Sequence, residues 1–300
     1  MQPARLLVRS IRGLAALALS FGLAGSAFAQ QGQRDPFNGQ FGAVEIAAPP
    51  AEAARQAMAL GAALSALPPQ RSGQVDVYVI AASLWSDPVF EREATEGAAA
   101  LSRHLGAENR VIVLSAGSPD GRSLPSAAPN DIAAAIGRVG ELADPQEDLV
   151  VLFFTSHGHP NGAMALREAQ RMGSQMRPSH LRDMLTAAGI GNRLVIISSC
   201  FSGAFIAPLM DERSIVLTAA QADRSSFGCQ PERDWTFFGD ALFAQSLPQE
   251  RSLLTAFERA KGLIAQWERD RNLSPPSNPQ SHVGGVASRV LTQAERDARD

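Results

Sequence analysis

Apolar positions along the chain follow two different spacings. Continuous apolar runs rich in β-branched and aromatic residues cover residues 75–82, 110–114, 149–154, 194–197 and 214–218. Runs of this length, bounded by polar residues, Gly and Pro, predict strands that are buried on both faces. Between them, segments with helical spacing or helix start signals predict helices at residues 51–67, 90–105, 131–142, 178–188, 237–246 and 252–270. This alternation predicts an α/β fold of three layers, a mostly parallel sheet with helices on both faces, in one domain.

The first 29 residues differ in composition from the rest of the chain. Three arginines, Arg5, Arg9 and Arg12, precede an apolar stretch at residues 14–23, and Ala-Phe-Ala follows at 27–29. This order is typical of a secretory signal peptide. The apolar stretch is short for a membrane span, so an uncleaved anchor is the less favoured alternative. We therefore expect an exported protein, periplasmic or secreted, with no stable membrane anchor after cleavage.

Three further segments complete the predicted organisation. Residues 30–71 are rich in Ala, Gln, Gly and Pro and are predicted to be a flexible N-terminal segment or a propeptide. Residues 72–292 carry the alternating pattern and form the expected main domain. Residues 293–300 are expected to be a charged tail that frays. Nothing in the pattern specifies an oligomeric state.

Charge excludes some classes of partner. The chain has 27 basic and 30 acidic residues, a formal net charge of −3, and no run of basic residues. Nucleic-acid binding normally requires a basic patch or stripe, so nucleic acid is not an expected partner. No motif for a cofactor is present, and we expect none.

Two of the predicted strands lead directly into reactive residues. The run at 149–154 continues as Thr-Ser-His157-Gly158, and the run at 194–197 continues as Ser-Ser-Cys200. Open α/β sheets place catalytic groups beyond the carboxyl ends of their strands. If the two strands are neighbours, their backbones lie roughly 4.8 Å apart. The sequence therefore predicts that an imidazole and a thiol meet at one edge of the sheet.

These two groups suit nucleophilic catalysis. An imidazole at His157 can stabilise a thiolate at Cys200 and return the proton to a leaving amine. The backbone N–H groups of Gly158 and Cys200 are candidates for an oxyanion hole. Taken singly, a buried Cys usually packs as a small apolar residue, so a structural role for either residue stays open.

Two other interpretations of these residues stay open as well. An exported chain would normally pair its two cysteines, Cys200 and Cys229, and that disulfide would make the chemistry impossible. The H-x-H pair of His157 and His159 could bind a metal, but no second cluster of ligands lies nearby in the sequence. We expect no metal site.

The motifs also resemble those of a known family. Residues 155–158 and 198–203 look like the two catalytic motifs of the legumain-like (asparaginyl endopeptidase) cysteine peptidases, which share the caspase-like fold. Residues 218–229 and 235–240 resemble the segments that line and follow the family's specificity pocket. Residues 79–83 fall where the family has its first strand. The resemblance covers about residues 75 to 260.

The resemblance implies roles for several residues and also contains departures. It makes Cys200 the nucleophile and His157 the base, and it places Ser225 and Asp240 at positions that form the pocket for the residue before the scissile bond. The family has an acidic residue where this chain has Ser198, which becomes a candidate pocket residue.

The region after the first strand departs most. Members with strict asparagine preference carry an Asn and then a basic residue there, whereas residues 84–90 contain neither. Either Asp87 takes the place of the third catalytic member or there is none, and Asp87 is also a candidate for substrate binding. Asparagine specificity is therefore not implied.

The sequence predicts an exported cysteine endopeptidase that hydrolyses peptide bonds in peptides or proteins through a Cys-His dyad and a thioester acyl-enzyme. A transpeptidase or transamidase with the same dyad, and a non-catalytic caspase-like binding protein, are the alternatives.

Overall fold

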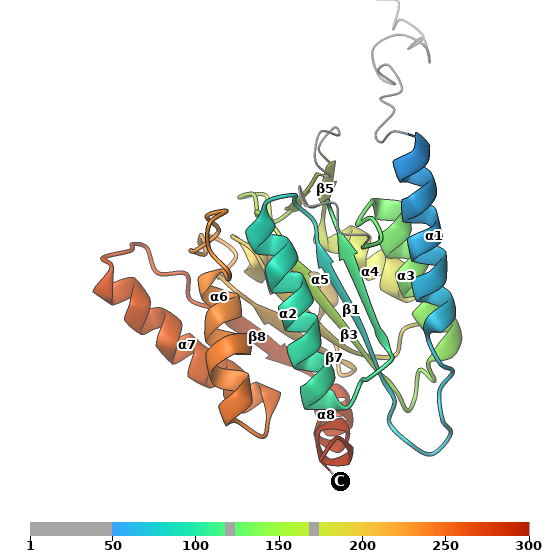
Figure 1. Ribbon diagram of the computed structural model, residues 1–300. Helices are drawn as coiled ribbons and strands as arrows, with labels where there is room; N and C mark the ends of the chain where they lie inside the picture. The colour runs from blue at the N-terminus through green and yellow to red at the C-terminus, as the bar shows by residue number, and fades with distance from the viewer. Residues whose placement is uncertain (1–49, 118–123, 168–173, 300) are drawn as a thin grey trace, which may run out of the picture. The chain divides into compact units, whose positions relative to one another are not determined.

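Figure 1 shows a computed structural model of the chain, which describes residues 50–117, 124–167 and 174–299. By its contacts the chain divides into two units, Met1–Val44 and Glu45–Asp300. The predicted signal peptide at residues 1–29 lies outside the described residues. Across the described ranges, no helix combines the length and the apolar character needed to cross a membrane.

A six-stranded sheet forms the centre of the second unit, with the strand order β2-β1-β3-β6-β7-β8. The first five strands in this order are parallel and β8 is antiparallel to β7. The strands are β1 (Val77–Ser83), β2 (Val111–Ser115), β3 (Leu149–Thr155), β6 (Asn192–Ser198), β7 (Ser214–Thr218) and β8 (Gln280–Val283). All five strands predicted from the apolar runs are present, and β3 and β6 are neighbours as the predicted chemistry required.

Three short strands were not predicted. The edge strand β8 lies in a segment expected to be a loop, because its sequence is polar and its residues alternate between half-buried and exposed. A separate hairpin of β4 (Met164–Leu166) and β5 (Ser174–Met176) lies in the segment expected to be a loop after His157. Strands of three or four residues offer too little pattern to recognise from sequence.

The helices begin where the sequence places proline or a turn. The longer ones are α1 (Pro50–Ala66), α2 (Pro88–Leu105), α3 (Pro129–Leu142), α4 (Pro178–Ala187), α7 (Leu253–Asp270) and α8 (Gly285–Asp297). Proline at the first helical position loses no hydrogen bond and already has a helical φ angle, which explains four of these starts. Shorter turns are α5 (Ile206–Leu209), α6 (Phe237–Gly239), the π-helical segment Asp240–Ser246, and two 3₁₀ turns, Ser202–Phe205 and Leu247–Gln249.

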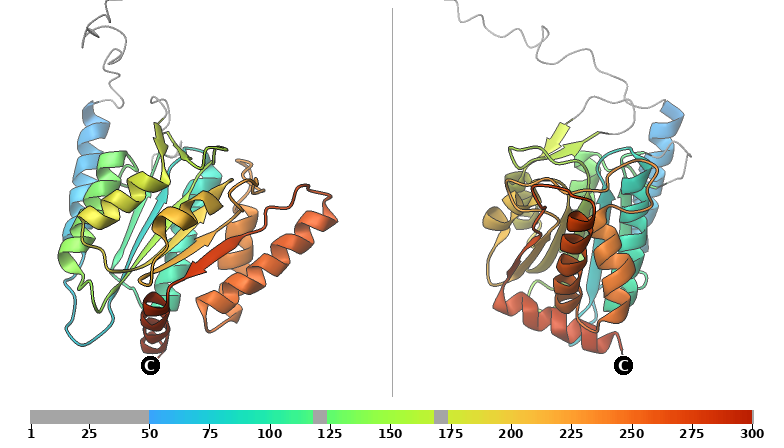
Figure 2. Two further views of the ribbon diagram at one scale, coloured as in Figure 1. Left: turned by 180° about the vertical axis from the view of Figure 1, so that it is seen from behind. Right: turned by 90° about the vertical axis from the view of Figure 1, so that its left-hand side faces the viewer.

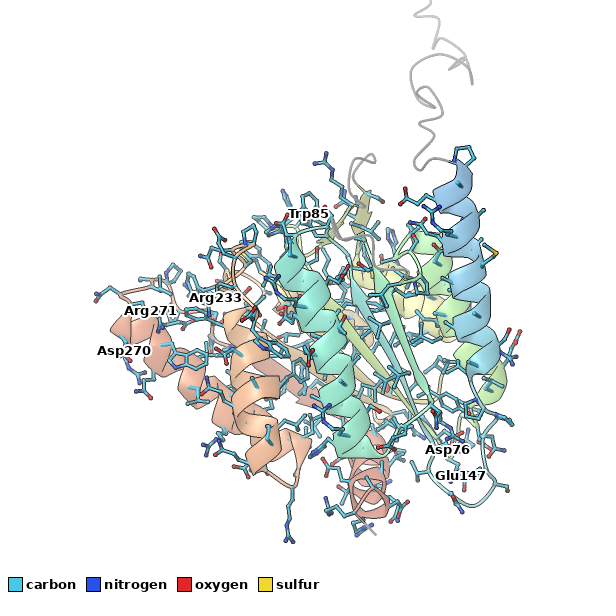
Figure 3. All side chains as sticks on the ribbon, in the orientation of Figure 1. Asp76, Trp85, Glu147, Arg233, Asp270 and Arg271 are labelled. Carbon is cyan, nitrogen blue, oxygen red and sulfur yellow. The ribbon has the colours of Figure 1, made fainter. Side chains whose placement is uncertain are left out.

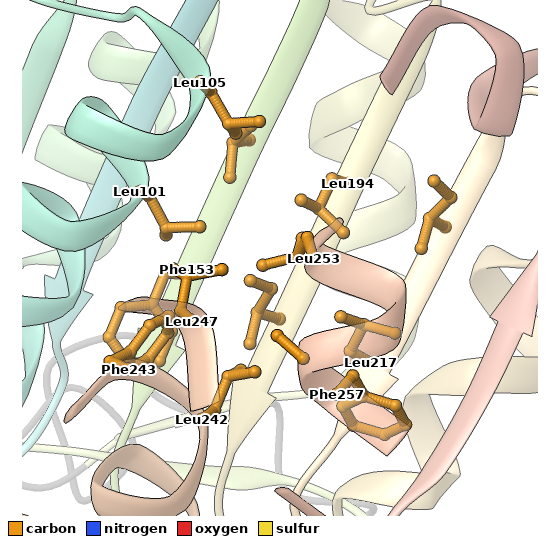
Figure 4. Close-up of a cluster of buried hydrophobic side chains, with 14 of the residues drawn as sticks. Leu101, Leu105, Phe153, Leu194, Leu217, Leu242, Phe243, Leu247, Leu253 and Phe257 are labelled. Carbon is orange, nitrogen blue, oxygen red and sulfur yellow. The ribbon is translucent and has the colours of Figure 1, made fainter. Parts of the chain in front are cut away.

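Alternate residues of the central strands pack on opposite faces of the sheet. In β3, Val151 and Phe153 belong to a core shared with α2, α7, α8 and residues 238–247. Leu152 and Phe154 belong to a second core shared with α3, α4 and α5. Figures 1 and 2 show the two groups of helices on the two sides of the sheet, and Figure 4 shows Phe153 within the first core. The predicted α/β fold with a mostly parallel sheet and helices on both faces is confirmed.

Both ends of the predicted main domain differ from expectation. Helix α8 replaces the charged tail expected from residue 293, because Ala294 and Glu295 are buried and Glu295 accepts a hydrogen bond from the amide of Leu253 (2.6 Å). At the other end, Leu67 is buried and Arg71 pairs with the body of the unit, so the folded part begins before residue 72. The propeptide role of residues 30–71 stays a prediction.

Candidate active site

Four strands end in hydroxyl side chains at the same level of the sheet. Ser83 is aligned with Ser115 on one side and with Thr155 on the other, and Thr155 is aligned with Ser198. Strand side chains alternate with a period of two, so all four lie on the face where Phe153 packs, the face that α2 covers. All four residues are buried. We call these four residues the hydroxyl row, and it lies at the carboxyl ends of the strands.

Helix α2 places two buried glutamates over this row. Glu93, which has no exposed surface, accepts hydrogen bonds from Thr155 Oγ1 (2.6 Å), Thr236 Oγ1 (2.7 Å) and Ser198 Oγ (3.0 Å). Glu91 accepts one from Ser115 Oγ (2.5 Å). Within the described residues no arginine or lysine pairs with Glu93. Burial raises the pKa of Glu93 to about 7, against the opposing effect of its hydroxyl donors.

Glu93 was not among the residues singled out from the sequence. Its position carried a signal, because it lies four residues after Val89 and four before Gly97, both on the buried side of α2. A carboxylate on the apolar face of a helix requires buried partners. The sequence could not show that these partners follow the strands leading to His157 and Cys200.

The imidazole of His157 is held by residues from the connection between β1 and α2. Trp85 and Phe90 contact it edge-on, with ring centroids at 5.4 and 4.9 Å. Nε2 lies 3.4 Å from Asp87 Oδ2, and the two side chains are 38% and 32% exposed. Asp87 therefore lies where a third catalytic member would orient the ring. With Nε2 facing Asp87, Nδ1 is the nitrogen left for proton transfer.

Gly158 brings the chain after β3 against the chain after β6. A Cβ at residue 158 would overlap the carbonyl oxygen of Cys200, so only glycine fits. The amides of Gly158 and Cys200 donate to no acceptor among the described residues. Two free N–H groups thus lie at the junction where the oxyanion hole was expected.

The thiol of Cys200 lies against Ser226, in the loop after β7. Its Sγ accepts from the amide of Ser226 (3.3 Å) and from its hydroxyl (3.7 Å). The next residue, Phe201, has a φ of 58°, which is rare for a bulky side chain, and its amide donates to Arg224 O (2.7 Å). Within the described part, the imidazole and Sγ share no hydrogen bond. The backbone segments that carry the imidazole and the thiol are brought together by the contact between Gly158 and Cys200.

The two cysteines are both free, so the structure does not contain the alternative disulfide. Cys229 lies near Cys200, and burial, followed by the charge of Cys200, raises the pKa of its thiol. Within the described ranges, no group of three or more His, Cys, Asp or Glu side chains could hold a metal ion.

The remaining candidate residues are spread more widely. Ser225 is exposed beside Ser226. Ser198 is buried with its hydroxyl turned to Glu93, so it reaches a substrate only through other groups. Asp240 accepts from Gln245 in its own helical segment (3.0 Å), and in the described part no contact joins it to the dyad. The structure therefore brings Asp87 to the dyad and leaves Asp240 apart from it.

A cavity of about 440 Å³ lies beside the same loop. Phe227 and Gly228 line it next to Ser226, and Phe237 lines it from the segment beyond. The guanidinium groups of Arg233 and Arg271 lie 5.1 and 5.2 Å from the centre of the Phe237 ring. Figure 3 labels both arginines at this side of the molecule. The loop that contacts Cys200 therefore also borders this cavity.

The comparison with protein families agrees with the sequence motifs. The sequence model of the Peptidase C13 family matches residues 128–285, more than half of the chain. The matched range contains His157 and Cys200 but neither Asp87 nor Glu93. Among solved structures, the crystal structure of caspase-1 from Spodoptera frugiperda matches with a TM-score of 0.49 and 14% identity, covering 73% of this chain and 93% of that one. No curated protein matches the sequence significantly.

Proposed function

Because the chain belongs to the Peptidase C13 family, the legumain family of cysteine peptidases, we propose that it is an exported endopeptidase that hydrolyses peptide bonds through Cys200 and His157. One observation carries the proposal. The contact of Gly158 with Cys200 joins the ends of two neighbouring strands, one leading to the imidazole and the other to the thiol. The substrate is a peptide or protein.

The proposed reaction has two steps. In the first, the Cys200 thiol gives its proton to the His157 ring and the sulfur bonds to the carbonyl carbon. The C–N bond then breaks, and the amine leaves with that proton. In the second, water attacks the carbonyl carbon of the thioester and gives a proton to the imidazole. The C–S bond then breaks, which releases the acid, and the sulfur takes the proton from the imidazole to restore the thiol.

In this scheme the amides of Gly158 and Cys200, which donate to no acceptor among the described residues, would donate to the oxyanion of each intermediate. The thiol donates to the carbonyl oxygen of Ser226 (3.6 Å), and the amide and hydroxyl of the same residue supply two donors for the negative charge that forms on the sulfur.

Asp87 has an orienting role in this scheme. Its carboxylate faces Nε2, which leaves Nδ1 as the atom that exchanges the proton with sulfur, amine and water. The edge contacts of Trp85 and Phe90 restrict rotation of the ring. The base is thus oriented from β1 and α2, elements outside the range that the family model matches.

The test compares Cys200→Ala with Cys229→Ala in the purified protein. We expect the wild type and Cys229→Ala to cleave members of a peptide library and to react at Cys200 with an electrophilic peptide probe under reducing conditions. Cys200→Ala should do neither. Unchanged cleavage by Cys200→Ala would contradict the proposal.

The same experiment separates the two alternatives. Addition of a free amine should leave the products unchanged for a hydrolase, whereas a transpeptidase would join the amine to the new carboxyl end. A binding protein without turnover would leave Cys200 unlabelled and the peptides intact.

Export is the second part of the proposal and rests on residues 1–29. We expect the full-length chain, produced in a host with a secretory pathway, to be recovered outside the cytoplasm with Gln30 as its first residue. N-terminal sequencing checks this, and recovery of the chain with its first 29 residues in the cytoplasm would contradict it.

A further inference from the structure

We propose that Glu93 is a positioning residue of the active site, whose carboxylate joins the strand ends that lead to His157 and Cys200 to the loop that contacts the thiol. This inference rests on the proposed function. Glu93 touches neither sulfur nor imidazole, and it acts through the three hydroxyl groups that it binds.

The three partners of Glu93 belong to the three segments that form the site. Thr155 is two residues before His157, and Ser198 is two residues before Cys200. Thr236 ends the segment from Ser225, which contains the residue that contacts Sγ. A shift of any one segment relative to the others would therefore lengthen a hydrogen bond to a single buried carboxylate.

An ionised Glu93 can accept hydrogen bonds from all three hydroxyl groups at once. The Thr236 hydroxyl accepts from the amide of Gly239 (3.1 Å), and its own proton is directed to Glu93. Thr155 and Ser198 donate their hydroxyl protons to the same carboxylate. A protonated Glu93 would have to donate in its turn, so at least one of the three hydroxyls would have to reverse.

Because Glu93 joins three segments of the site, the reversal of one of these hydrogen bonds would affect how the segments are held together. Since burial raises the pKa of Glu93 to about 7, the carboxylate changes state near neutral pH. As the pH falls through this value, the group gains a proton and the three segments lose an arrangement in which every hydroxyl points inward. Catalytic geometry is sensitive to such changes, and a displacement of about 1 Å can cost roughly 100-fold in rate.

Other ionisable groups lie on the elements packed around Glu93, and their effects on the pH profiles must be distinguished from the effect of Glu93. Asp87 lies just before α2, and the first half of α2 contains Glu91, Arg92 and Glu96. His157 and His159 follow β3, and Cys200 follows β6. The groups between β7 and the end of the π-helical segment are Asp223, Arg224, Cys229, Glu232, Arg233, Asp234 and Asp240. The variant Glu93→Gln separates Glu93 from all of them, because Gln keeps the shape of the side chain and has no charge. Glu91→Gln is the matched control, a second buried acid of the same helix that binds the other end of the hydroxyl row.

The experiment measures kcat and KM on a cleaved peptide, and the rate of Cys200 alkylation by iodoacetamide, both from pH 5 to 9. We expect Glu93→Gln to lower kcat roughly 10- to 100-fold with little change in KM. It should also lack an inflection near pH 7 that the wild type shows in both measurements. Glu91→Gln should keep the wild-type kcat and both pH profiles. Wild-type kcat and profiles in a folded Glu93→Gln variant would overturn the proposal.

A second variant covers the case in which Glu93→Gln fails to fold. Ser198→Ala removes one donor and leaves the charge, so kcat should fall less and the inflection should move to higher pH. If Ser198→Ala folds and matches the wild type in both measurements, the positioning role is overturned.

Alkylation also distinguishes this inference from the proposed function, because it requires no peptide cleavage. If no peptide is cleaved, yet the inflection in alkylation disappears in Glu93→Gln, the proposed function fails and the positioning role stands. If the wild type cleaves peptides and Glu93→Gln does so equally well at every pH, the opposite holds.

Discussion

The two ends of the sheet both bury carboxylates, but they stabilise them differently. At the amino end, Asp76 is 1% exposed and binds two cations, Arg71 Nη2 at 2.7 Å and Arg110 Nη2 at 3.2 Å. Its neighbour Asp148 accepts from the backbone amides of Asp76 (2.9 Å) and Asp144 (2.8 Å). Figure 3 labels Asp76 at this end of the sheet and Trp85 at the other.

At the carboxyl end, no arginine or lysine in the described part of the chain pairs with Glu93. Glu93 binds three hydroxyls, and Asp87 faces an imidazole at 3.4 Å. Opposite charge offsets the desolvation of Asp76, whereas neutral donors alone offset that of Asp148 and of Glu93, and burial raises the pKa of both of these groups. Perturbed pKa values cluster at functional sites, but structural networks such as the one around Asp148 produce them too. We therefore expect the ion pairs of Asp76 to contribute to stability, and the groups around His157 and Cys200 to contribute to the proposed chemistry.

The largest expected effect is on catalysis alone. His157→Gln should lower kcat by roughly 10²- to 10⁴-fold, because general acid–base catalysis contributes about that much. The free energy of unfolding should change little, since the ring is partly exposed. Steady-state kinetics and denaturant unfolding check both. His159→Gln, an exposed neighbour, is the control, and an equal loss of kcat in that variant would contradict the assignment.

At the amino end of the sheet we expect the opposite result, a loss of stability without a loss of turnover. Asp76→Asn should lower the free energy of unfolding by about 3 kcal/mol, because it leaves Arg110 nearly buried beside a neutral group. Turnover by the folded fraction should be unchanged. Urea unfolding measures the first and active-site-titrated kinetics the second. Glu147→Gln, on the rim of the same end, should affect neither, and a loss of kcat in Asp76→Asn would break the division between the two ends.

A third prediction concerns the pH dependence of stability. The native pKa of Glu93 is raised to about 7, so its contribution favours the folded state below its unfolded pKa and is lost as the pH rises through 7. This shift corresponds to about 3 kcal/mol between pH 4 and pH 8. Glu93→Gln should lose this dependence and be relatively more stable at pH 8. Parallel unfolding curves for variant and wild type across this range would contradict the prediction.

A glycine substitution tests the junction itself. Gly158→Ala should destabilise the protein by about 1–3 kcal/mol, because the added Cβ must displace the backbone at Cys200. It should also lower kcat, since the same backbone carries the nucleophile. Gly137→Ala is the control, because nothing lies within 4 Å of a Cβ at that helical position and alanine favours helices. Thermal unfolding and steady-state kinetics of both variants test these expectations, and equal effects of the two substitutions would contradict them.

The smallest effect is expected at Asp87. Asp87→Asn keeps an oxygen near Nε2 but removes the charge of a partly exposed pair, and such pairs contribute at most about 1 kcal/mol, or roughly fivefold in kcat. The measurement is kcat over pH for the variant and the wild type. A loss as large as that of His157→Gln would show that Asp87 does more than orient the ring.

Features that leave a local apolar pattern in the sequence could be predicted, and features that depend on how the elements pack could not. The continuous apolar run of β3 predicts a buried strand, and the carboxyl end of that strand determines where His157 lies. The same logic places Cys200 beyond β6. Strand β8 escaped prediction because an edge strand can be polar on both faces and leaves no apolar pattern.

Glu93 and Asp240 show that the surroundings of an acid side chain on a helix could not be predicted. Both are acids on helical segments, and the apolar pattern of α2 marks Glu93 as buried without showing which groups it binds. Helix α2 crosses the hydroxyl row, whereas the side chain of Asp240 turns to Gln245. Which acid meets which strand end depends on how a helix lies on the sheet, and that is a property of the whole core. The resemblance aligns residues and not side-chain directions, so the pocket role of Asp240 stays a prediction.

The fit of Gly158 against Cys200 has a consequence for interpreting related sequences. The glycine is required by packing between two strand ends, so a descendant that lost the thiol would still keep it as long as the sheet kept its register. A glycine at this position therefore says nothing about whether a relative is an active enzyme. Genome surveys that seek working members should weigh the imidazole and the thiol, and should count the glycine only as a mark of shared ancestry and architecture.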